Sequence, residues 1–153
     1  MAHGRKYAIN GNATCTQSAT LPLLTVISTA NVRPKIFDLL LGSAASPVDQ
    51  QGRFQLQRCT TTGTPGSSIT PQALDGDPAA LATSGLAVFS AGPTLTANAF
   101  LLTLVGAMRS SLRWVAKDGA EIVLPATASN GVALMATSIS AAWSLDMCVH
   151  YSE

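Results

Sequence analysis

Few side chains in this chain are of the types that carry out nucleophilic catalysis. The sequence contains two histidines, His3 and His150, and a serine–histidine–aspartate triad would have to use one of them as its base. It contains no Gly-x-Ser-x-Gly motif, the turn that exposes a nucleophilic serine between a strand and a helix. We therefore interpret His3 as an exposed terminal residue and His150 as a polar residue on a strand face, and we expect no enzymatic activity.

The turn Asp75-Gly-Asp-Pro78 brings two carboxylates close together in the sequence, which suggests a calcium site. Calcium requires about six to eight oxygen ligands, and this turn lacks the later ligands of a calcium-binding loop. A short helical turn over Asp77–Ala82 explains both carboxylates, with Asp77 as its N-cap and Pro78 in its first position. The pattern therefore favours a capped turn, and we expect no metal ion.

The other carboxylates and the thiols also indicate structural roles. Asp118 and Glu121 flank a turn, where charged side chains are normally solvated and do not face each other across a cleft as a glycosidase pair does. The three cysteines, Cys15, Cys59 and Cys148, are odd in number, far apart and without a metal-ligand spacing. We expect buried, reduced thiols and no cofactor, with one disulfide and a spare thiol as the alternative.

Two pairs of basic residues have spacings that place both members on one face of a strand. Arg33 and Lys35 flank a proline, and Arg109 and Arg113 bracket another strand. Each pair could contact an acidic partner, or could keep a strand edge solvated. We retain Arg33 and Lys35 as candidate partner-binding residues.

The low charge of the chain is its strongest functional signal. Only 11% of its 153 residues are charged, 47% are hydrophobic, and nine basic and eight acidic residues leave a formal net charge of +1. An ordinary soluble domain carries about 25% charged residues, so much of this surface is expected to be covered by other protein. No block of Lys or Arg is long enough to indicate a nucleic-acid face. We expect a subunit of a homo-oligomer or larger assembly.

Short apolar and β-branched runs between turn residues predict strands and no long helix. The candidate strands are Lys6–Ile9, Leu23–Ser28, Lys35–Leu41, Arg53–Thr60, Leu86–Ser90, Asn98–Val105, Ser110–Val115, Glu121–Leu124, Val132–Ser138 and Trp143–Tyr151. The turn Lys117–Ala120 has Asp-Gly chemistry and predicts a hairpin between its flanking strands. The spacing predicts an all-β fold: an antiparallel β-sandwich of about eight strands, jelly-roll-like, with an up-and-down barrel as the alternative.

Two of these strands show which side chains should face the core. In Arg53–Thr60, Phe54 and Leu56 alternate with Gln55 and Gln57. The last strand places its large apolar residues on one face: Trp143, Leu145, Met147, Val149 and Tyr151. Its other face carries Ser144, Asp146, Cys148 and His150. For Trp114 and Trp143 we favour core packing over an exposed sugar-binding platform.

The chain is expected to divide into an N-terminal arm, residues 1–20, and a single β-sandwich domain, residues 21–153. The arm is polar and interrupted by glycine and asparagine, so we expect it outside the core. Its cluster of Arg5, Lys6 and Tyr7 combines charge with an aromatic ring, as interface hot spots do, and is a candidate clamp on a partner. Deletion of residues 1–10 should weaken binding to shells or to neighbouring subunits and leave thermal unfolding nearly unchanged.

Two further segments bear on organisation and location. The segment 61–96 is long for a connection, and we expect part of it to be structured. The apolar run Leu21–Ile27 is seven residues long and follows twenty mostly polar residues, which fits neither a signal peptide nor a membrane helix of about twenty apolar residues. We expect a protein that is made in a cytoplasm, moves with its assembly and has no membrane contact.

Several stretches together resemble the small virion proteins of tailed bacteriophages, most closely capsid decoration (cement) proteins. They are Arg33-Pro-Lys-Ile-Phe-Asp-Leu-Leu-Leu-Gly-Ser43, Phe54-Gln-Leu-Gln-Arg58 and the region Trp114–Leu134. The resemblance lies in the overall residue pattern and in the strand order over most of the chain after about Leu21, and no short diagnostic motif supports it. It implies a jelly-roll-like, non-enzymatic protein on the outside of an icosahedral shell, a dimer or trimer with the major capsid protein as its partner.

Two rival functions follow from the same pattern. A sugar-binding or fibre-tip module would need exposed aromatic and polar groups in one loop cluster. A tail or baseplate component would differ from a capsid decoration protein mainly in its partner, whose symmetry it would match.

Overall fold

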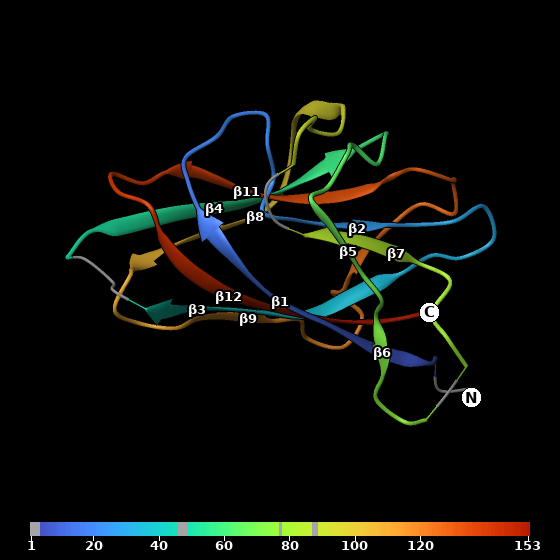
Figure 1. The fold of residues 1–153 in the computed structure, drawn as a ribbon. Coiled ribbons are helices and arrows are strands. Elements are labelled where there is room, and N and C mark those ends of the chain that lie inside the picture. Colours follow the sequence, from blue (N-terminus) through green and yellow to red (C-terminus); the bar gives the residue numbers. More distant parts are fainter. Residues whose placement is uncertain (1–3, 46–48, 77, 87–88) are drawn as a thin grey trace.

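Two antiparallel β-sheets packed face to face make up the protein (Figure 1). The computed structural model describes residues 4–45, 49–76, 78–86 and 89–153, and these residues contain no helix. No helix long and apolar enough to cross a membrane is present in those ranges either. The predicted all-β sandwich is confirmed. Asp77, the expected helix cap, lies outside the described residues, and residues 78–82 are not helical.

We call the two layers sheet A and sheet B. Sheet A contains β1 (Lys6–Cys15), β3 (Lys35–Ala45), β6 (Gln72–Ala73), β9 (Leu112–Val115), β10 (Ile122–Val123) and β12 (Trp143–Ser152). Its order is β10-β3-β12-β1-β6, with β9 also beside β3. Sheet B contains β2 (Leu24–Ile27), β4 (Gln51–Cys59), β5 (Ser67–Ile69), β7 (Thr83–Leu86), β8 (Leu95–Ala107) and β11 (Gly131–Ser138). Its order is β5-β7-β2-β11-β4-β8.

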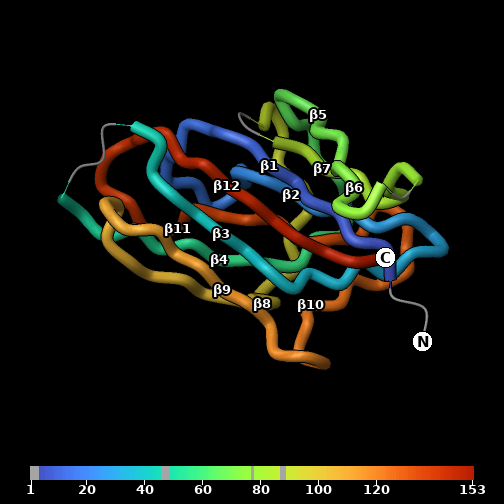
Figure 2. The backbone as a smooth tube through the Cα atoms, turned by 90° about the horizontal axis from the view of Figure 1, so that it is seen from below, coloured from blue at the N-terminus to red at the C-terminus, as the bar shows by residue number. Residues whose placement is uncertain are grey.

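The long strands pair in a nested pattern. β1 pairs with β12, β2 with β11, β3 with β9 and β10, and β4 with β8. The first four strands therefore pair with the last strands in reverse order, while the chain crosses back and forth between the sheets (Figure 2). Because most pairings join distant parts of the sequence, neither sheet can form from one local segment.

The two sheets enclose one hydrophobic core, built by the predicted alternation of side chains. On β4, Phe54 and Leu56 are each 3% exposed, and on β12 all five predicted inward residues are buried. The rings of Phe54 and Trp143 meet edge to face with centroids 6.0 Å apart. Trp114 is half-buried and packs against the same core. Both tryptophans thus contribute to packing, as expected.

The expected N-terminal arm is wrong for residues 6–15, because these residues form β1 inside sheet A. β1 pairs with β12 along its whole length, from Lys6 opposite Ser152 onward. Tyr7 and Ile9 are fully buried. The ring of Tyr7 stacks on Tyr151 at 5.5 Å between centroids. Tyr7 is therefore a core residue and not part of an exposed clamp.

The sequence of β1 did not predict a core strand, because its outer face is polar and one inner position is glycine. Asn10 and Asn12 point outward, which gives the segment a hydrophilic appearance. Gly11 faces inward, where a Cβ atom would collide with the side chain of Leu86. A glycine here allows the two sheets to approach closely, although in the sequence it reads as a strand breaker.

The predicted hairpin around Lys117–Ala120 is also wrong, although its turn forms. The amide of Ala120 donates to the carbonyl of Lys117 at 2.8 Å, and Gly119 has a φ of +81°. However, β9 and β10 do not pair with each other: both pair antiparallel with β3, one after the other along the same edge. The turn therefore connects two segments of one interrupted edge strand and does not join the two strands of a hairpin. Local turn chemistry does not determine which strand becomes the neighbour.

Part of the long segment 61–96 is structured, as expected. It contains β5, β6 and β7. Of the predicted strand Leu86–Ser90, Leu86 belongs to β7, residues 87–88 lie outside the described residues, and Phe89 and Ser90 are not in a strand. The carboxylate of Glu153 accepts hydrogen bonds from the amides of Leu81 (3.0 Å) and Ala82 (2.7 Å). This contact joins the segment to the C-terminal end of β12.

Replacement of Tyr7 tests whether β1 belongs to the core. Tyr7→Ala should lower the free energy of unfolding by about 3–5 kcal/mol, because it removes a buried aromatic ring and leaves a cavity. The neighbouring Lys6→Ala, at an exposed position, should change it by less than about 0.5 kcal/mol. Urea denaturation of both variants measures the difference. Equal stability of the two variants would show that residues 6–15 are an arm after all.

Candidate functional site

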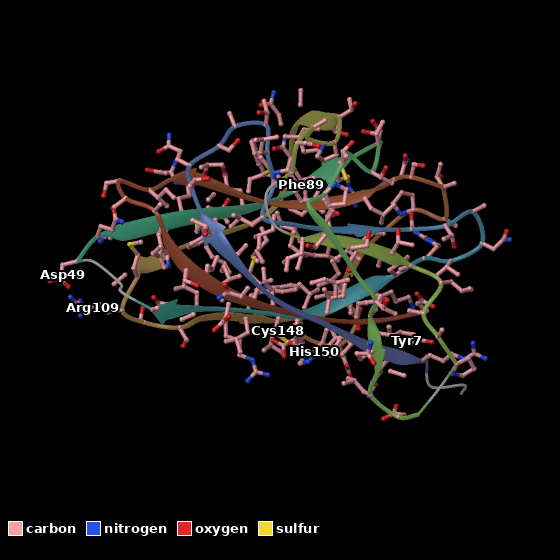
Figure 3. All side chains as sticks on the ribbon, in the orientation of Figure 1. Tyr7, Asp49, Phe89, Arg109, Cys148 and His150 are labelled. Atoms are coloured by element: carbon pink, nitrogen blue, oxygen red, sulfur yellow. The ribbon has the colours of Figure 1, made fainter. Side chains whose placement is uncertain are left out.

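Four side chains with reactive or charged groups lie close together on the outer face of sheet A. They come from three neighbouring strands: Arg113 from β9, Asp38 from β3, and Cys148 and His150 from β12. Asp38 lies directly opposite His150 in the strand register. In Figure 3, Cys148 and His150 lie together on the side of the sheet that faces away from the core.

The four groups form a continuous chain of hydrogen bonds. The guanidinium of Arg113 donates to both carboxylate oxygens of Asp38, at 3.0 Å from Nε and 2.8 Å from Nη2. The Nδ1 atom of His150 lies 3.1 Å from Oδ2 of Asp38. Its Nε2 atom lies 3.4 Å from Sγ of Cys148. The order is thiol, imidazole, carboxylate, guanidinium.

Electrostatics decide which atoms carry protons. Asp38 is only 5% exposed, yet the hydrogen bond from Arg113 holds the pKa of its carboxyl below the usual value, with a smaller contribution from His150. An ionised carboxylate only accepts hydrogen bonds, so Nδ1 of His150 donates to Asp38. In the neutral ring Nε2 is then an acceptor, and the thiol of Cys148 donates to it.

The thiol itself is not activated in this arrangement. Burial raises the pKa of Cys148, the negative charge of Asp38 raises it further, and the positive charge of Arg113 only partly compensates. Cys148 is therefore a neutral thiol at neutral pH. A catalytic cysteine normally has a lowered pKa.

A shallow depression of about 430 Å³ adjoins the thiol on the same face. Its lining residues come from β1, β3, β12 and the turn before β9: Asn10, Gly11, Asn12, Leu40, Gly42, Ser111, Asp146, Met147 and Cys148. The amide of Asn12 donates to Asp146 Oδ1 at 2.7 Å and to Ser144 Oγ at 2.9 Å. Polar and apolar groups both line the depression, and Leu40 is its exposed apolar residue.

The nucleophile, base and carboxylate are in the order of a hydrolase triad, but the surroundings do not complete an acyl-transfer site. Such a site needs free N–H donors aimed at the developing oxyanion. Around Cys148 the backbone of β12 is paired on both edges, with Asn10 of β1 and Leu40 of β3 as its partners. Together with the neutral thiol, this geometry favours binding over catalysis.

The structure gathers the basic candidates of the sequence at one end of sheet A. Lys6 and Lys35 lie on either side of Ser152, in neighbouring strands. Arg5 and Arg33 precede these strands by one and two residues and are exposed, as both lysines are. We name Arg5, Lys6, Arg33 and Lys35 the basic end. From the sequence they were predicted as a cluster of Arg5, Lys6 and Tyr7 and a separate pair of Arg33 and Lys35, and Tyr7 does not belong with them.

The remaining candidates have ordinary surroundings. Arg109 forms an exposed ion pair with Asp49, and Glu121 accepts a hydrogen bond from Gly119 N within its own turn (3.3 Å). Asp75 and Asp118 are exposed. His3 and Asp77 lie outside the described residues.

The prediction of buried, reduced thiols is confirmed for two of the three cysteines. All three are free; Cys15 and Cys59 are buried, whereas Cys148 is only half-buried. Burial raises the pKa of Cys15 to about 12 and that of Cys59 to about 11. Cys148 is therefore the accessible thiol of the chain.

Sequence reasoning placed Cys148 and His150 on one strand face but missed the site. The alternation Cys-x-His was the available signal. The partners Asp38 and Arg113 belong to strands that are distant in sequence, and no local pattern connects them to β12.

A second depression of about 400 Å³ lies between the segment 61–85 and β2. Its lining is rich in threonine, serine and proline, and none of its residues carries a charge: Thr25, Ile27, Thr62, Gly63, Pro65, Ser68, Ile69, Thr70, Pro71, Ala80, Ala82, Thr83, Ser84 and Gly85. It offers hydroxyl groups and apolar surface but no group for catalysis.

Comparison of the chain with protein-family models, with curated proteins and with solved structures found no match. Within the described ranges, no group of three or more His, Cys, Asp or Glu side chains is placed to hold a metal ion. The site must therefore be judged on its own geometry.

Thiol labelling tests the difference between the cysteines. In the native protein one thiol should react with an aromatic disulfide reagent, and Cys148→Ser should abolish this reaction while Cys59→Ser leaves it unchanged. Because its pKa is raised, Cys148 should react more slowly at pH 7.5 than a free cysteine, and its rate should still increase above about pH 9. Rapid reaction of two or three thiols in the folded protein would contradict the burial described here.

Proposed function

We propose that this chain is a structural subunit of a protein assembly, and specifically a decoration protein on the exterior of a tailed-bacteriophage capsid. It would act as a dimer or trimer bound to the major capsid protein, in a virion made in the host cytoplasm. The low charge of the chain and its resemblance to small virion proteins support this role. The nested strand pairing, which is the pairing expected of a jelly roll, supports the same comparison.

The observation that carries the proposal is the edge strand β8. It spans 13 residues, Leu95–Ala107, and none of them is charged. Among the described residues, only one edge of β8 is paired, with β4, so its other edge presents backbone N–H and C=O groups that no described strand pairs with. Phe100 is 46% and Val105 54% exposed on this strand.

A long, uncharged edge strand is a strong site for association with protein. Monomeric proteins normally protect such edges with charges, prolines or short strands. The pairing of β8 with β4 shifts in register at two places, between Phe100 and Leu102 and between Leu95 and Phe100, where Asn98 has a φ of +56°. The strand from Leu102 to Ala107 is regular, and β9 of the other sheet, in which Val115 is 56% exposed, contacts β8. This side of the sandwich is suited to pairing with another chain.

The basic end of sheet A supplies a second, polar surface. Its four cations, Arg5, Lys6, Arg33 and Lys35, extend across neighbouring strands near the two chain ends. Glu153 lies at the same end, where its amide donates to the carbonyl of Arg5, so the four cations leave a net positive surface. Such a surface steers a partner of opposite charge and helps to orient its binding. We assign this end to the acidic surface of the shell and the β8 side to contacts between copies.

Lysine substitutions on β8 test the self-association. Val105→Lys and Phe100→Lys should weaken it about tenfold or more, because each places an unpaired charge in an interface otherwise free of charge. Leu74→Lys is the matched control, because Leu74 is 49% exposed and directly follows β6, the edge strand of sheet A opposite β10. Sedimentation over a range of concentrations measures the effect. A wild-type protein that stays monomeric at high micromolar concentration would count against the β8 interface.

Charge reversal tests the attachment to the shell. Lys6→Glu combined with Lys35→Glu should reduce cosedimentation with undecorated capsids about tenfold or more and remove much of its salt dependence. Arg109→Glu is the control, because Arg109 lies at the far end of the molecule from Tyr7 and the start of β1 (Figure 3). If the wild-type protein does not bind capsids, the decoration role is wrong even if the chain self-associates.

A further inference from the structure

The pair Cys148 and His150 has a geometry that neither core packing nor the proposed assembly role requires. The two side chains are neighbours on the outer face of β12, two residues apart. Sγ and Nε2 lie 3.4 Å apart, and the side chain of His150 is 29% exposed. Both atoms are types of ligand that zinc prefers in proteins.

We propose that Cys148 Sγ and His150 Nε2 form a two-ligand binding site for a divalent ion of the zinc class on the outer face of sheet A. The inference is independent of the proposed function. Water completes the coordination, on the side that opens toward the depression beside Cys148.

The distance between the two ligand atoms matches tetrahedral coordination. With Zn–S of about 2.3 Å and Zn–N of about 2.0–2.1 Å, a tetrahedral angle separates the two ligand atoms by about 3.6 Å. The observed 3.4 Å requires only a small adjustment of either side chain. A linear two-coordinate ion with similar bond lengths would require about 4.3 Å, so the observed distance is closer to that of tetrahedral coordination.

The outer partners of a metal-binding histidine are already in place. A ligating imidazole usually donates its other ring N–H to a carboxylate, which fixes the ring and increases its basicity. Here Nδ1 of His150 donates to Asp38 at 3.1 Å. The bidentate contact with Arg113 holds Asp38 in turn. Nε2 is therefore oriented as a ligand before any ion binds.

Binding replaces one hydrogen bond by two metal–ligand bonds. The S–H bond of Cys148 breaks, its proton passes to solvent, the thiolate binds the ion, and the lone pair of Nε2 binds it as well. No electron is transferred. With only two protein ligands the affinity is lower than that of a four-ligand structural zinc site.

Titration of the full chain with Co²⁺ and Zn²⁺ under reducing conditions tests the site. Co²⁺ should produce a thiolate-to-cobalt charge-transfer band that saturates at one ion per chain, and Zn²⁺ should abolish the band. Cys148→Ser should remove the band and weaken Zn²⁺ binding at least about tenfold, while Cys59→Ser, at a buried thiol, should change neither. His150→Gln should weaken binding by a similar factor.

A further variant separates direct ligands from the supporting carboxylate. Asp38→Asn should retain the band but weaken Zn²⁺ binding roughly 10–100-fold, as the loss of an outer partner does. Circular dichroism checks that this variant folds; if it does not, Cys148→Ser and His150→Gln decide the question. Absence of the band in the wild-type chain, or Zn²⁺ affinity unchanged by either ligand substitution, would overturn the proposal.

Discussion

The position of the last strand, β12, between β1 and β3 is the constraint on which the rest of the structure depends. Its backbone pairs on both edges, and its inward side chains supply much of the shared core. Because β1 comes from the start of the chain and β12 from its end, sheet A closes only when both ends are in place. The hydrogen bond from Glu153 N to Arg5 O, at 2.9 Å, continues this pairing beyond the strands.

The same strand determines the chemistry of the outer surface. A strand alternates its side chains between two faces, so the residues between the buried apolar positions of β12 must point outward. Cys148 and His150 are two of these residues, and the rigid pairing with β3 positions Asp38 opposite the imidazole. A site built on paired strands holds its groups more precisely than a loop does. The core and the site thus depend on one register.

The edges of the two sheets differ in their protection. In sheet B, the edge strand β5 has three residues and is followed closely by Pro71, whereas β8 has 13 residues and no charge. In sheet A, the edge formed by β9 and β10 is interrupted, and it carries the Arg113 guanidinium. Short and charged edges resist pairing with other chains, and long apolar edges favour it. The edges of the two sheets therefore differ in how strongly they favour pairing with another chain.

Much of the fold was predictable because strand faces are a local property. The alternation in β4 and β12 correctly predicted Phe54, Leu56 and the inward residues of the last strand, and the spacing of apolar runs predicted an all-β sandwich. The prediction failed where a strand has a polar outer face and an inward glycine, as β1 does around Gly11. Burial of Tyr7 depends on contact with Tyr151, which no neighbouring residue in the sequence reveals.

By itself, then, the sequence determined the strands, their buried faces and a surface poor in charge, since each follows from residue type and a period of two. Only the tertiary structure decided which strands became neighbours. It directed β9 and β10 to β3 in place of a hairpin, brought Arg5 and Lys6 to the same end as Arg33 and Lys35, and joined Asp38 and Arg113 to His150 and Cys148. The physical reason is that partner choice depends on burying all apolar faces in one core at once, a condition that extends over the whole chain.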